Sequence, residues 1–133
     1  ADFETVGWPQ TGEIDIMEYR GQEPSAVHGS VHGPGYSAGN AVTKKYIIPQ
    51  DRFDTGFHIF AVEWGPDFIE WYVDDQPYQR ITPDGVPGEW VYDHPFSIIL
   101  NLAVGGSFVG FVGPNTTFPQ TMLVDYVRVY SEG

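Results

Sequence analysis

The sequence contains no cysteine, which excludes disulfide bridges and every metal or redox site built from thiolates. It also lacks any run approaching the ~20 consecutive apolar residues of a membrane-spanning helix. Its first residues, Ala-Asp-Phe-Glu, are unlike the basic and apolar regions of a signal peptide, so a secreted form would already have lost its signal. We therefore expect no cysteine chemistry and no membrane partner.

Basic residues are scarce: 6 Lys and Arg stand against 18 Asp and Glu, a formal net charge of -12. Nucleic-acid binding depends on clustered basic side chains, so nucleic acid is excluded as a partner. Repulsion also disfavours anionic membranes and sulfated polysaccharides. A neutral partner fits better, and the aromatic content of 16% would suit stacking on the apolar faces of sugar rings.

Long segments free of glycine and proline are missing as well, because 16 glycines and 11 prolines are spread along the 133 residues. This spacing argues against long helices. Most of the intervals between them alternate apolar and polar residues, as strands do, and residues 96–104 are nearly all apolar, as in a strand buried on both sides. We predict an all-β jelly-roll sandwich, with one domain over residues 1–133. An immunoglobulin-like binding module has the same strand pattern, so the fold alone does not decide the function. The predicted strands are residues 12–18, 25–32, 57–64, 68–73, 96–104 and 122–130, with a turn at 74–77.

One segment, Gly12-Glu13-Ile14-Asp15-Ile16-Met17-Glu18, carries three carboxylates within six residues. Regular alternation would place Glu13 and Asp15 on one face and Glu18 on the opposite, apolar face, where a charge is costly. One extra residue near Ile16-Met17, a β-bulge, returns Glu18 to the face of Glu13 and Asp15. We predict this bulge, a row of three carboxylates on one face, and apolar side chains turned to the core.

Carboxylates this close raise one another's pKa, so at least one is expected to stay protonated near neutral pH. A glycosidase needs such a pair: one carboxylate that attacks and one carboxylic acid that protonates the leaving oxygen. Retaining enzymes hold the two carboxyls about 5–5.5 Å apart, which two residues on one face of a bulged strand can reach. An acidic exposed strand face or a calcium ladder would show the same pattern, and both readings stay open at this point.

Glu-Ile-Asp-Ile-Met-Glu resembles the E-x-D-x-x-E signature of glycoside hydrolase family 16. The form with the extra residue is similar to that of laminarinases, which are endo-β-1,3-glucanases, and to that of agarases and carrageenases. Mixed-linkage lichenases usually have the shorter form E-x-D-x-E. The resemblance holds in order and spacing across essentially the whole chain, through residues 8–21, 28–32, 57–64, 69–74, 100–106 and 124–130.

The resemblance implies a concanavalin A-like jelly roll and a retaining endo-β-1,3-glucanase that needs no cofactor for its chemistry. It implies Glu13 as the nucleophile, Glu18 as the general acid/base and Asp15 as the assisting carboxylate. The substrate would be a neutral, laminarin-like β-glucan. The residues implied to line the substrate cleft are Trp8, His32, Trp64 and Asn101, with Phe108 where laminarinases often carry a Trp.

The carboxylate motif begins at residue 13, whereas family members usually carry several strands before it. The resemblance therefore implies that N-terminal strands are lacking, which would leave open sheet edges. We expect a fragment, a permuted form, or a complementing chain that supplies the missing strands.

Asp125 is the predicted metal ligand. Alternation places it with Leu123, Val127 and Val129 on an apolar face, where a carboxylate needs a partner or a metal. The corresponding Asp of laminarinase-like proteins resembles a ligand of structural Ca2+.

We also expect a secreted, bacterial protein. The alternatives to a laminarinase are an agarase or mixed-linkage glucanase, a non-catalytic β-glucan-binding module, and a half-domain that acts only when complemented.

Overall fold

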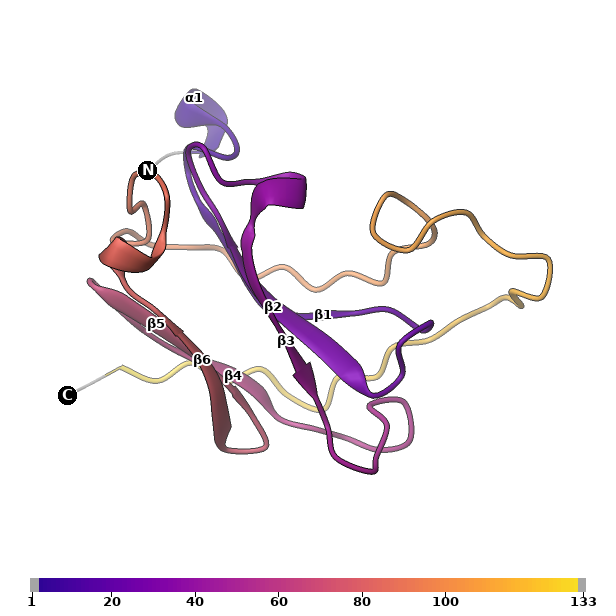
Figure 1. Ribbon diagram of the computed structural model, residues 1–133. Coiled ribbons are helices and arrows are strands. Elements are labelled where there is room, and N and C mark those ends of the chain that lie inside the picture. The colour runs from indigo at the N-terminus through magenta and orange to yellow at the C-terminus, as the bar shows by residue number, and fades with distance from the viewer. Residues whose placement is uncertain (1–2, 132–133) are drawn as a thin grey trace. The chain divides into compact units, whose positions relative to one another are not determined.

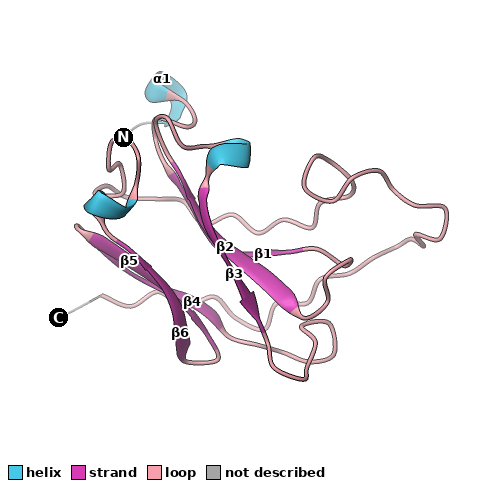
Figure 2. Ribbon diagram, viewed as in Figure 1, coloured by secondary structure: helices cyan, strands magenta, loops and turns pink. Residues whose placement is uncertain are grey.

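The computed structural model describes residues 3–131 and divides the chain into two compact units, Ala1–Phe96 and Ser97–Gly133. Each unit is described by itself, and the first carries the strands (Figures 1 and 2). Of the helices in the described part of the chain, none has the length and apolar character needed to cross a membrane. The short helical segments are α1 (Phe3–Val6) and two 3-10 turns (Ala38–Asn40 and Pro83–Gly85).

The first sheet is antiparallel and has the strand order β1-β2-β3. Its central strand follows the predicted alternation, because Val27 and Val31 are buried in the core while His28 and Ser30 point to the opposite face. The third strand was not predicted from the sequence, because Val-Thr-Lys-Lys-Tyr-Ile does not alternate regularly between apolar and polar residues. The strands are β1 (Glu13–Tyr19), β2 (Ala26–His32) and β3 (Val42–Ile47).

The second sheet is antiparallel with the order β4-β5-β6. Its strands are β4 (Phe60–Gly65), β5 (Phe68–Val73) and β6 (Gln76–Ile81). The middle strand coincides with the predicted segment 68–73.

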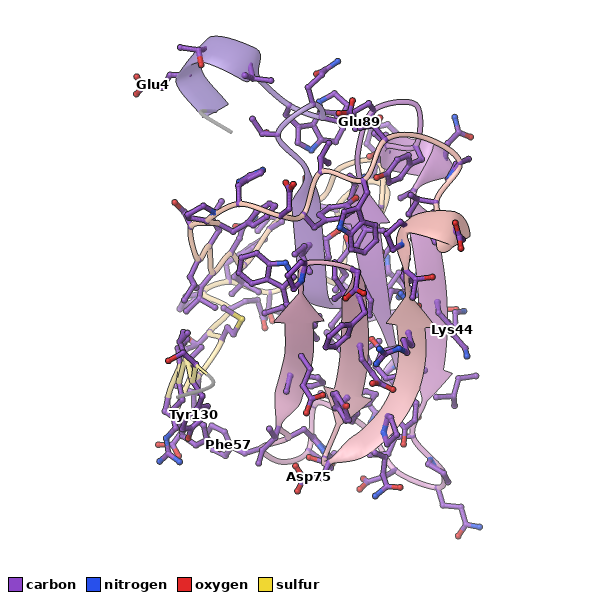
Figure 3. The ribbon with its side chains drawn as sticks, turned by 90° about the vertical axis from the view of Figure 1, so that its left-hand side faces the viewer. Glu4, Lys44, Phe57, Asp75, Glu89 and Tyr130 are labelled. Carbon is purple, nitrogen blue, oxygen red and sulfur yellow. The ribbon has the colours of Figure 1, made fainter. Side chains whose placement is uncertain are left out.

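The predicted bounds of β4 and of the turn before β6 are corrected. β4 begins at Phe60 and not at Phe57, because the Asp74 carboxylate accepts the Ile59 backbone N–H at 2.9 Å just before the strand begins. The predicted turn at 74–77 is only two residues long. Asp74 and Asp75 have φ angles of 48° and 63°, as a tight hairpin turn requires, and β6 follows at once. Figure 3 shows Asp75 at this turn.

The core lies between the two sheets, so the predicted all-β sandwich is confirmed. The Trp71 side chain of β5 is fully buried and donates its indole N–H to the backbone oxygen of Asp15 at 2.9 Å. This close approach explains Gly29 in β2, because a Cβ there would lie 2.5 Å from a Trp71 ring carbon. The second sheet thus supports the strands that carry the polar face. The main cluster of buried core residues consists of Val31, Tyr36, Ile69, Trp71, Ile81 and Tyr92.

The two strands predicted within residues 96–104 and 122–130 are wrong. No strand is assigned between residues 97 and 131 of the described chain, where the backbone makes an isolated bridge between Gly106 and Gly110. The apolar side chains of these segments are exposed, with Ile99 at 83% and Val129 at 78%. An apolar or alternating segment becomes a strand only where a neighbouring backbone completes the hydrogen-bond ladder. The described residues supply no such neighbour here.

Candidate active site

The predicted β-bulge in β1 is confirmed. Asp15 pairs with Ser30 and Glu18 pairs with His28, so three steps along β1 match two steps along β2. The extra residue lies between Asp15 and Glu18 and returns Glu18 to the face of Asp15. One expectation is corrected: Ile16 is 42% exposed instead of turned to the core. It lies in the irregular part of an edge strand, where no ladder neighbour holds it inward.

The polar face of the first sheet is ordered in rows that run across the strands. The pairing registers of β1 with β2 and of β2 with β3 define these rows. Carboxylates occupy the β1 end of each row, and β2 contributes an imidazole or a hydroxyl. The rows are Glu13 with His32, then Asp15 with Ser30 and Thr43, then Glu18 with His28 and Lys45.

Asp15 is the most perturbed carboxyl of the row. The pKa of Asp15 is raised from its ordinary 3.8 to about 6, mainly by burial. His32 opposes this rise, and the neighbouring Glu13 and Glu18 contribute to it. The cause is that water is replaced by protein around a group with anionic neighbours. Asp15 is thus the carboxyl of the row whose pKa is raised in the expected direction, with burial as the main cause.

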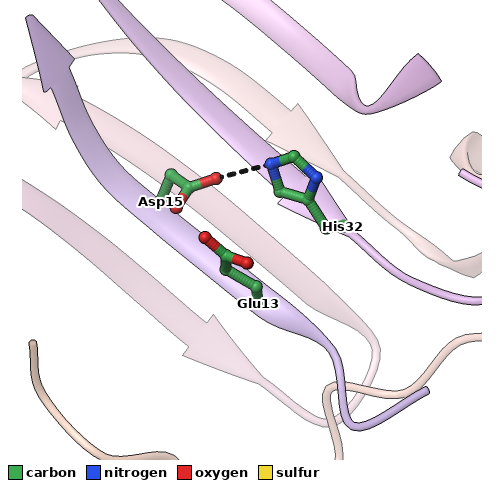
Figure 4. Close-up of side chains that lie close together, drawn as sticks. All are labelled: Glu13, Asp15 and His32. Carbon is green, nitrogen blue, oxygen red and sulfur yellow. Dashed lines mark ion pairs between the residues drawn. The ribbon is translucent and has the colours of Figure 1, made fainter. Parts of the chain in front are cut away.

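His32 faces Asp15 across the strands. Its Nε2 lies 3.0 Å from Asp15 Oδ2, and Figure 4 shows this pair beside the Glu13 carboxylate. The carboxylate raises the pKa of the His32 imidazole, although burial opposes the rise. The backbone N–H of Ala38 donates to His32 Nδ1 at 3.0 Å, so the neutral ring carries its proton on Nε2, the nitrogen that faces Asp15. The predicted cleft residue His32 thus contacts the assisting carboxylate.

Glu13 is held by Trp8. The Trp8 indole N–H donates to Glu13 Oε2 at 2.5 Å, and the residue is 44% exposed. The Trp8 ring centroid lies 5.9 Å from that of His32 at an interplanar angle of 45°. Trp8, predicted only to line the substrate cleft, therefore also binds the carboxylate of Glu13 directly.

Glu18 is held by hydroxyls. Ser30 Oγ donates to Glu18 Oε2 at 3.1 Å, and Thr43 Oγ1 donates to Ser30 Oγ at 2.9 Å. Sequence reasoning placed Ser30 on this face without a role and missed Thr43, because the strand that carries it was not predicted. Recognition of residues 42–47 as a strand next to β2 would have been the signal.

Glu13, Asp15 and His32 are also a set that could hold a metal ion, because one ligand atom from each lies within 4.8 Å of the others. Asp125, the predicted calcium ligand, does not belong to this set. The same atoms make up the carboxylate row and its supporting imidazole, and the chemistry of a glycosidase uses them without a metal.

Trp64 lies in β4 of the second sheet. Its indole N–H donates to the Tyr92 backbone oxygen at 2.5 Å, and its ring packs edge-on against Phe96 with 5.5 Å between centroids. These contacts join Trp64 to residues other than the carboxylates, and its role in the cleft stays a prediction.

Three predicted site residues, Asn101, Phe108 and Asp125, lie in the second unit. All three are exposed. Phe108 lies in the short turn closed by the hydrogen bond from the Gly110 N–H to the Gly106 oxygen at 2.7 Å. Because the two units are described separately, the roles of these residues stay predictions.

The arrangement in the first unit suits displacement at a sugar carbon. A carboxylate with a fixed N–H donor can attack, and a second carboxyl on the same strand face can exchange a proton with the leaving group. A third carboxyl of raised pKa lies between them and can donate a hydrogen bond to the first. Two carboxyls that flank one bond are the functional requirement of glycoside hydrolysis.

Comparisons with known proteins agree with this chemistry. The family model described as glycosyl hydrolases family 16 matches residues 3–128. A β-glucanase of Rhodothermus marinus is 43% identical over 141 residues, which cover 97% of this chain and 49% of that protein.

Solved structures give the same result. The endo-β-1,3-glucanase of Pyrococcus furiosus is 48% identical with a TM-score of 0.83, over 88% of this chain and 46% of that one. The laminarinase catalytic domain of Thermotoga maritima is 46% identical with a TM-score of 0.83, over 87% of this chain and 48% of that one. The predicted jelly-roll class is thereby confirmed, and the chain spans about half the length of these relatives. Since the family model covers residues 3–128, including the bulged carboxylate strand, the chain belongs to glycosyl hydrolase family 16.

Proposed function

We propose that this chain carries the catalytic strand of a retaining endo-β-1,3-glucanase that hydrolyses laminarin-like β-glucans. The observation that carries the proposal is the bulge in β1, which sets Glu13, Asp15 and Glu18 on one face. The relatives named β-glucanase, endo-β-1,3-glucanase and laminarinase support the substrate class. The net charge of -12 favours a neutral polysaccharide over a sulfated one.

In the first step, Glu13 attacks the anomeric carbon and Glu18 gives its proton to the leaving glycosidic oxygen. The bond between that carbon and oxygen breaks, and a covalent glycosyl-enzyme forms on Glu13. The N–H of Trp8 binds the Glu13 carboxylate and holds its orientation for attack. In the second step, Glu18 takes a proton from water, which displaces Glu13 and restores the starting configuration.

Asp15 assists without forming a bond to the sugar. With its proton in place, Asp15 donates a hydrogen bond to Glu13 and steadies the nucleophile's charge between the two steps. His32 faces the other side of this carboxyl and fixes its direction. The exposed ring of Trp8 is a stacking surface for a sugar, and Trp64, Asn101 and Phe108 are proposed to complete the cleft.

A structural Ca2+ with Asp125 as one ligand stays a proposal. Asp125 is exposed and is not part of the cluster Glu13, Asp15 and His32. Ca2+ takes 6–8 oxygen ligands, which include backbone carbonyls, so Asp125 would be one ligand among several. Thermal stability with and without millimolar Ca2+ tests the prediction, and no shift would count against it.

A complementing segment or chain is proposed to pair with residues 97–104 and 122–130. The support is the exposure of apolar side chains in these segments, with Ile99 at 83% and Leu123 at 72%. Exposed apolar patches of this kind commonly mark interaction surfaces. Secretion from a bacterial cell is proposed on the ground that the substrate is a polymer found outside cells.

The test is the release of reducing sugars from laminarin by this chain, alone and with the added N-terminal portion of a relative. The Glu13→Gln variant, which keeps the size of the side chain and loses its charge, is the control. Activity that disappears in Glu13→Gln supports the proposal. Absence of activity under both conditions, with glucan binding retained, favours the non-catalytic binding module, and a panel with agarose and mixed-linkage glucan reveals a different linkage.

A further inference from the structure

Glu18 is bound by a short chain of two hydroxyls that the steps above do not use. Ser30 Oγ lies 3.1 Å from Glu18 Oε2, and Thr43 Oγ1 lies 2.9 Å from Ser30 Oγ. Ser30 and Thr43 are direct cross-strand partners in β2 and β3. The chain of hydroxyls therefore runs across the sheet from its outer strand to the bulged end of β1.

The two hydroxyls differ in exposure. Ser30 is 1% exposed, so bulk water cannot replace its contacts, whereas Thr43 lies on the exposed side of β3. A hydroxyl has one proton to donate and can accept from others. When Ser30 gives its proton to Glu18, its oxygen is free to accept the proton of Thr43.

Charged groups on the same face are engaged elsewhere. His32 faces Asp15 at 3.0 Å, and Lys45 binds Glu23 at 2.7 Å. Neutral hydroxyls thus bind the carboxyl of Glu18, although the carboxyls of Glu13 and Asp15 share its strand face and His28 is its cross-strand partner.

We propose that Ser30 and Thr43 are positioning residues that hold Glu18 in both of its protonation states. This inference rests on the proposed function, in which Glu18 is the acid/base. With Glu18 ionised, protons point from Thr43 to Ser30 to the carboxylate. With Glu18 protonated, its proton is on the other carboxyl oxygen, which is the one left free for the leaving group. Oε2 then still accepts from Ser30, and Ser30 still accepts from Thr43.

These contacts persist through both halves of the reaction. In glycosylation, Glu18 passes the proton of its other carboxyl oxygen to the leaving oxygen and becomes a carboxylate, while Oε2 continues to accept from Ser30. In the second step, that other oxygen takes a proton from water. Ser30 and Thr43 are chemically unchanged at the end, and the position of Glu18 is preserved throughout.

Thr43 offers the sharper test, because it is exposed and its replacement does not disturb the core. Thr43→Val removes the hydroxyl at nearly constant shape, and Thr43→Ser restores it. The full chain is assayed on laminarin and on a 2,4-dinitrophenyl β-laminaribioside. Dinitrophenolate leaves without a proton, so its initial burst reports attack by Glu13 without help from the acid.

We expect Thr43→Val to lower steady-state kcat on laminarin about three- to tenfold, the loss that corresponds to one net hydrogen bond. KM should stay within about twofold of its starting value, since Thr43 acts here through Glu18 and not through the substrate. The dinitrophenolate burst rate should stay unchanged, and Thr43→Ser should match the parent. Ser30→Ala should give a larger loss of kcat on laminarin with the burst again retained.

Equal kcat for Thr43→Val and the parent would overturn the proposal. So would an equal loss in Thr43→Ser, or a burst that falls together with kcat, because either would indicate a general distortion of the sheet. Glu18→Gln separates the two levels of inference. Near-normal laminarin turnover in Glu18→Gln refutes the proposed role of Glu18 itself. A severe loss of turnover in Glu18→Gln, together with normal turnover in Thr43→Val, refutes only the proposed role of the hydroxyls.

Discussion

The two ends of the carboxylate row are held by different kinds of group. Glu13 lies beside the Trp8 N–H and the Asp15–His32 pair, so ionisable groups and a fixed donor surround it. Glu18 contacts hydroxyls, which carry no charge and can either donate or accept. A nucleophile needs a constant charge and direction, whereas an acid/base must lose and regain a proton. The contacts at each end match these needs.

Replacement of Glu13 should prevent formation of the covalent intermediate, whereas replacement of Glu18 should remove the general acid/base. Glu13→Ala should lower turnover of laminarin by more than about 10⁴-fold, because no covalent intermediate can form. With azide and an activated aryl β-glycoside, this variant should yield the α-glycosyl azide, since azide occupies the space of the nucleophile. NMR of the product gives its configuration. A β-azide from Glu13→Ala would exchange the roles of Glu13 and Glu18.

Glu18→Gln should lower kcat on laminarin by about 10²–10⁴-fold, the usual contribution of general acid–base catalysis. The burst with a dinitrophenyl leaving group should survive, because that group needs no proton. Stopped-flow absorbance measures the burst. A burst lost as completely as laminarin turnover would contradict an acid/base role at this end of the row.

Trp8→Phe should separate the two roles of this side chain. It removes the N–H that binds Glu13 and keeps an aromatic ring, so kcat should fall about tenfold with little change in KM, as expected for a hydrogen bond to a charged group. Trp8→Ala should in addition raise KM. Steady-state kinetics on laminarin measure both constants. An unchanged kcat with a raised KM in Trp8→Phe would leave only the stacking role.

Asp15→Asn should flatten the dependence of stability on pH. The pKa of Asp15 is about 6 in the folded protein against an ordinary 3.8, so the folded state binds this proton more tightly than the unfolded chain. The free energy of unfolding therefore falls as pH rises from about 4 to about 6, and stays lower above that. The raised pKa of His32 acts in the same direction, because its contribution is lost as pH rises through the folded pKa.

The measurement is the difference in unfolding free energy between pH 4 and pH 7, obtained by denaturant titration. The fall should be smaller by about 1–3 kcal/mol in Asp15→Asn than in the parent. Asp75→Asn, at an exposed turn position whose left-handed backbone Asn also tolerates, is the matched control. Equal pH dependence in Asp15→Asn and the parent would contradict a raised pKa at Asp15.

Strands were predicted correctly from the sequence where the local pattern coincides with a pairing partner in the structure. The bulge in β1 followed from the conflict between alternation and the charge of Glu18, and the faces of β2 followed from alternation alone. Segments 97–104 and 122–130 have equally strong patterns but form no strand in the described structure. A strand needs a partner as well as a pattern, and the pattern carries no information about whether a partner is present.

The candidate site likewise has features that could be predicted from the local sequence and features that could not. The carboxylates could be identified from spacing, because three of them in one strand are costly without a use. The contacts that hold them could not. Trp8 reaches Glu13 only through the loop that follows Gly7, where φ is 76°, and Thr43 reaches Ser30 only because β3 pairs in one particular register. Loop path and register depend on the whole fold.

The most direct test of the central claim is to trap the covalent intermediate. The protein is incubated with a 2-deoxy-2-fluoro-β-laminaribiosyl fluoride, digested, and analysed by tandem mass spectrometry. We predict that the peptide containing Glu13 gains one fluorinated disaccharide on that residue, that the label is absent in Glu13→Gln, and that Glu18 is unlabelled. A label on Glu18, or normal turnover of laminarin without any label, would contradict the assignment of Glu13 as the nucleophile.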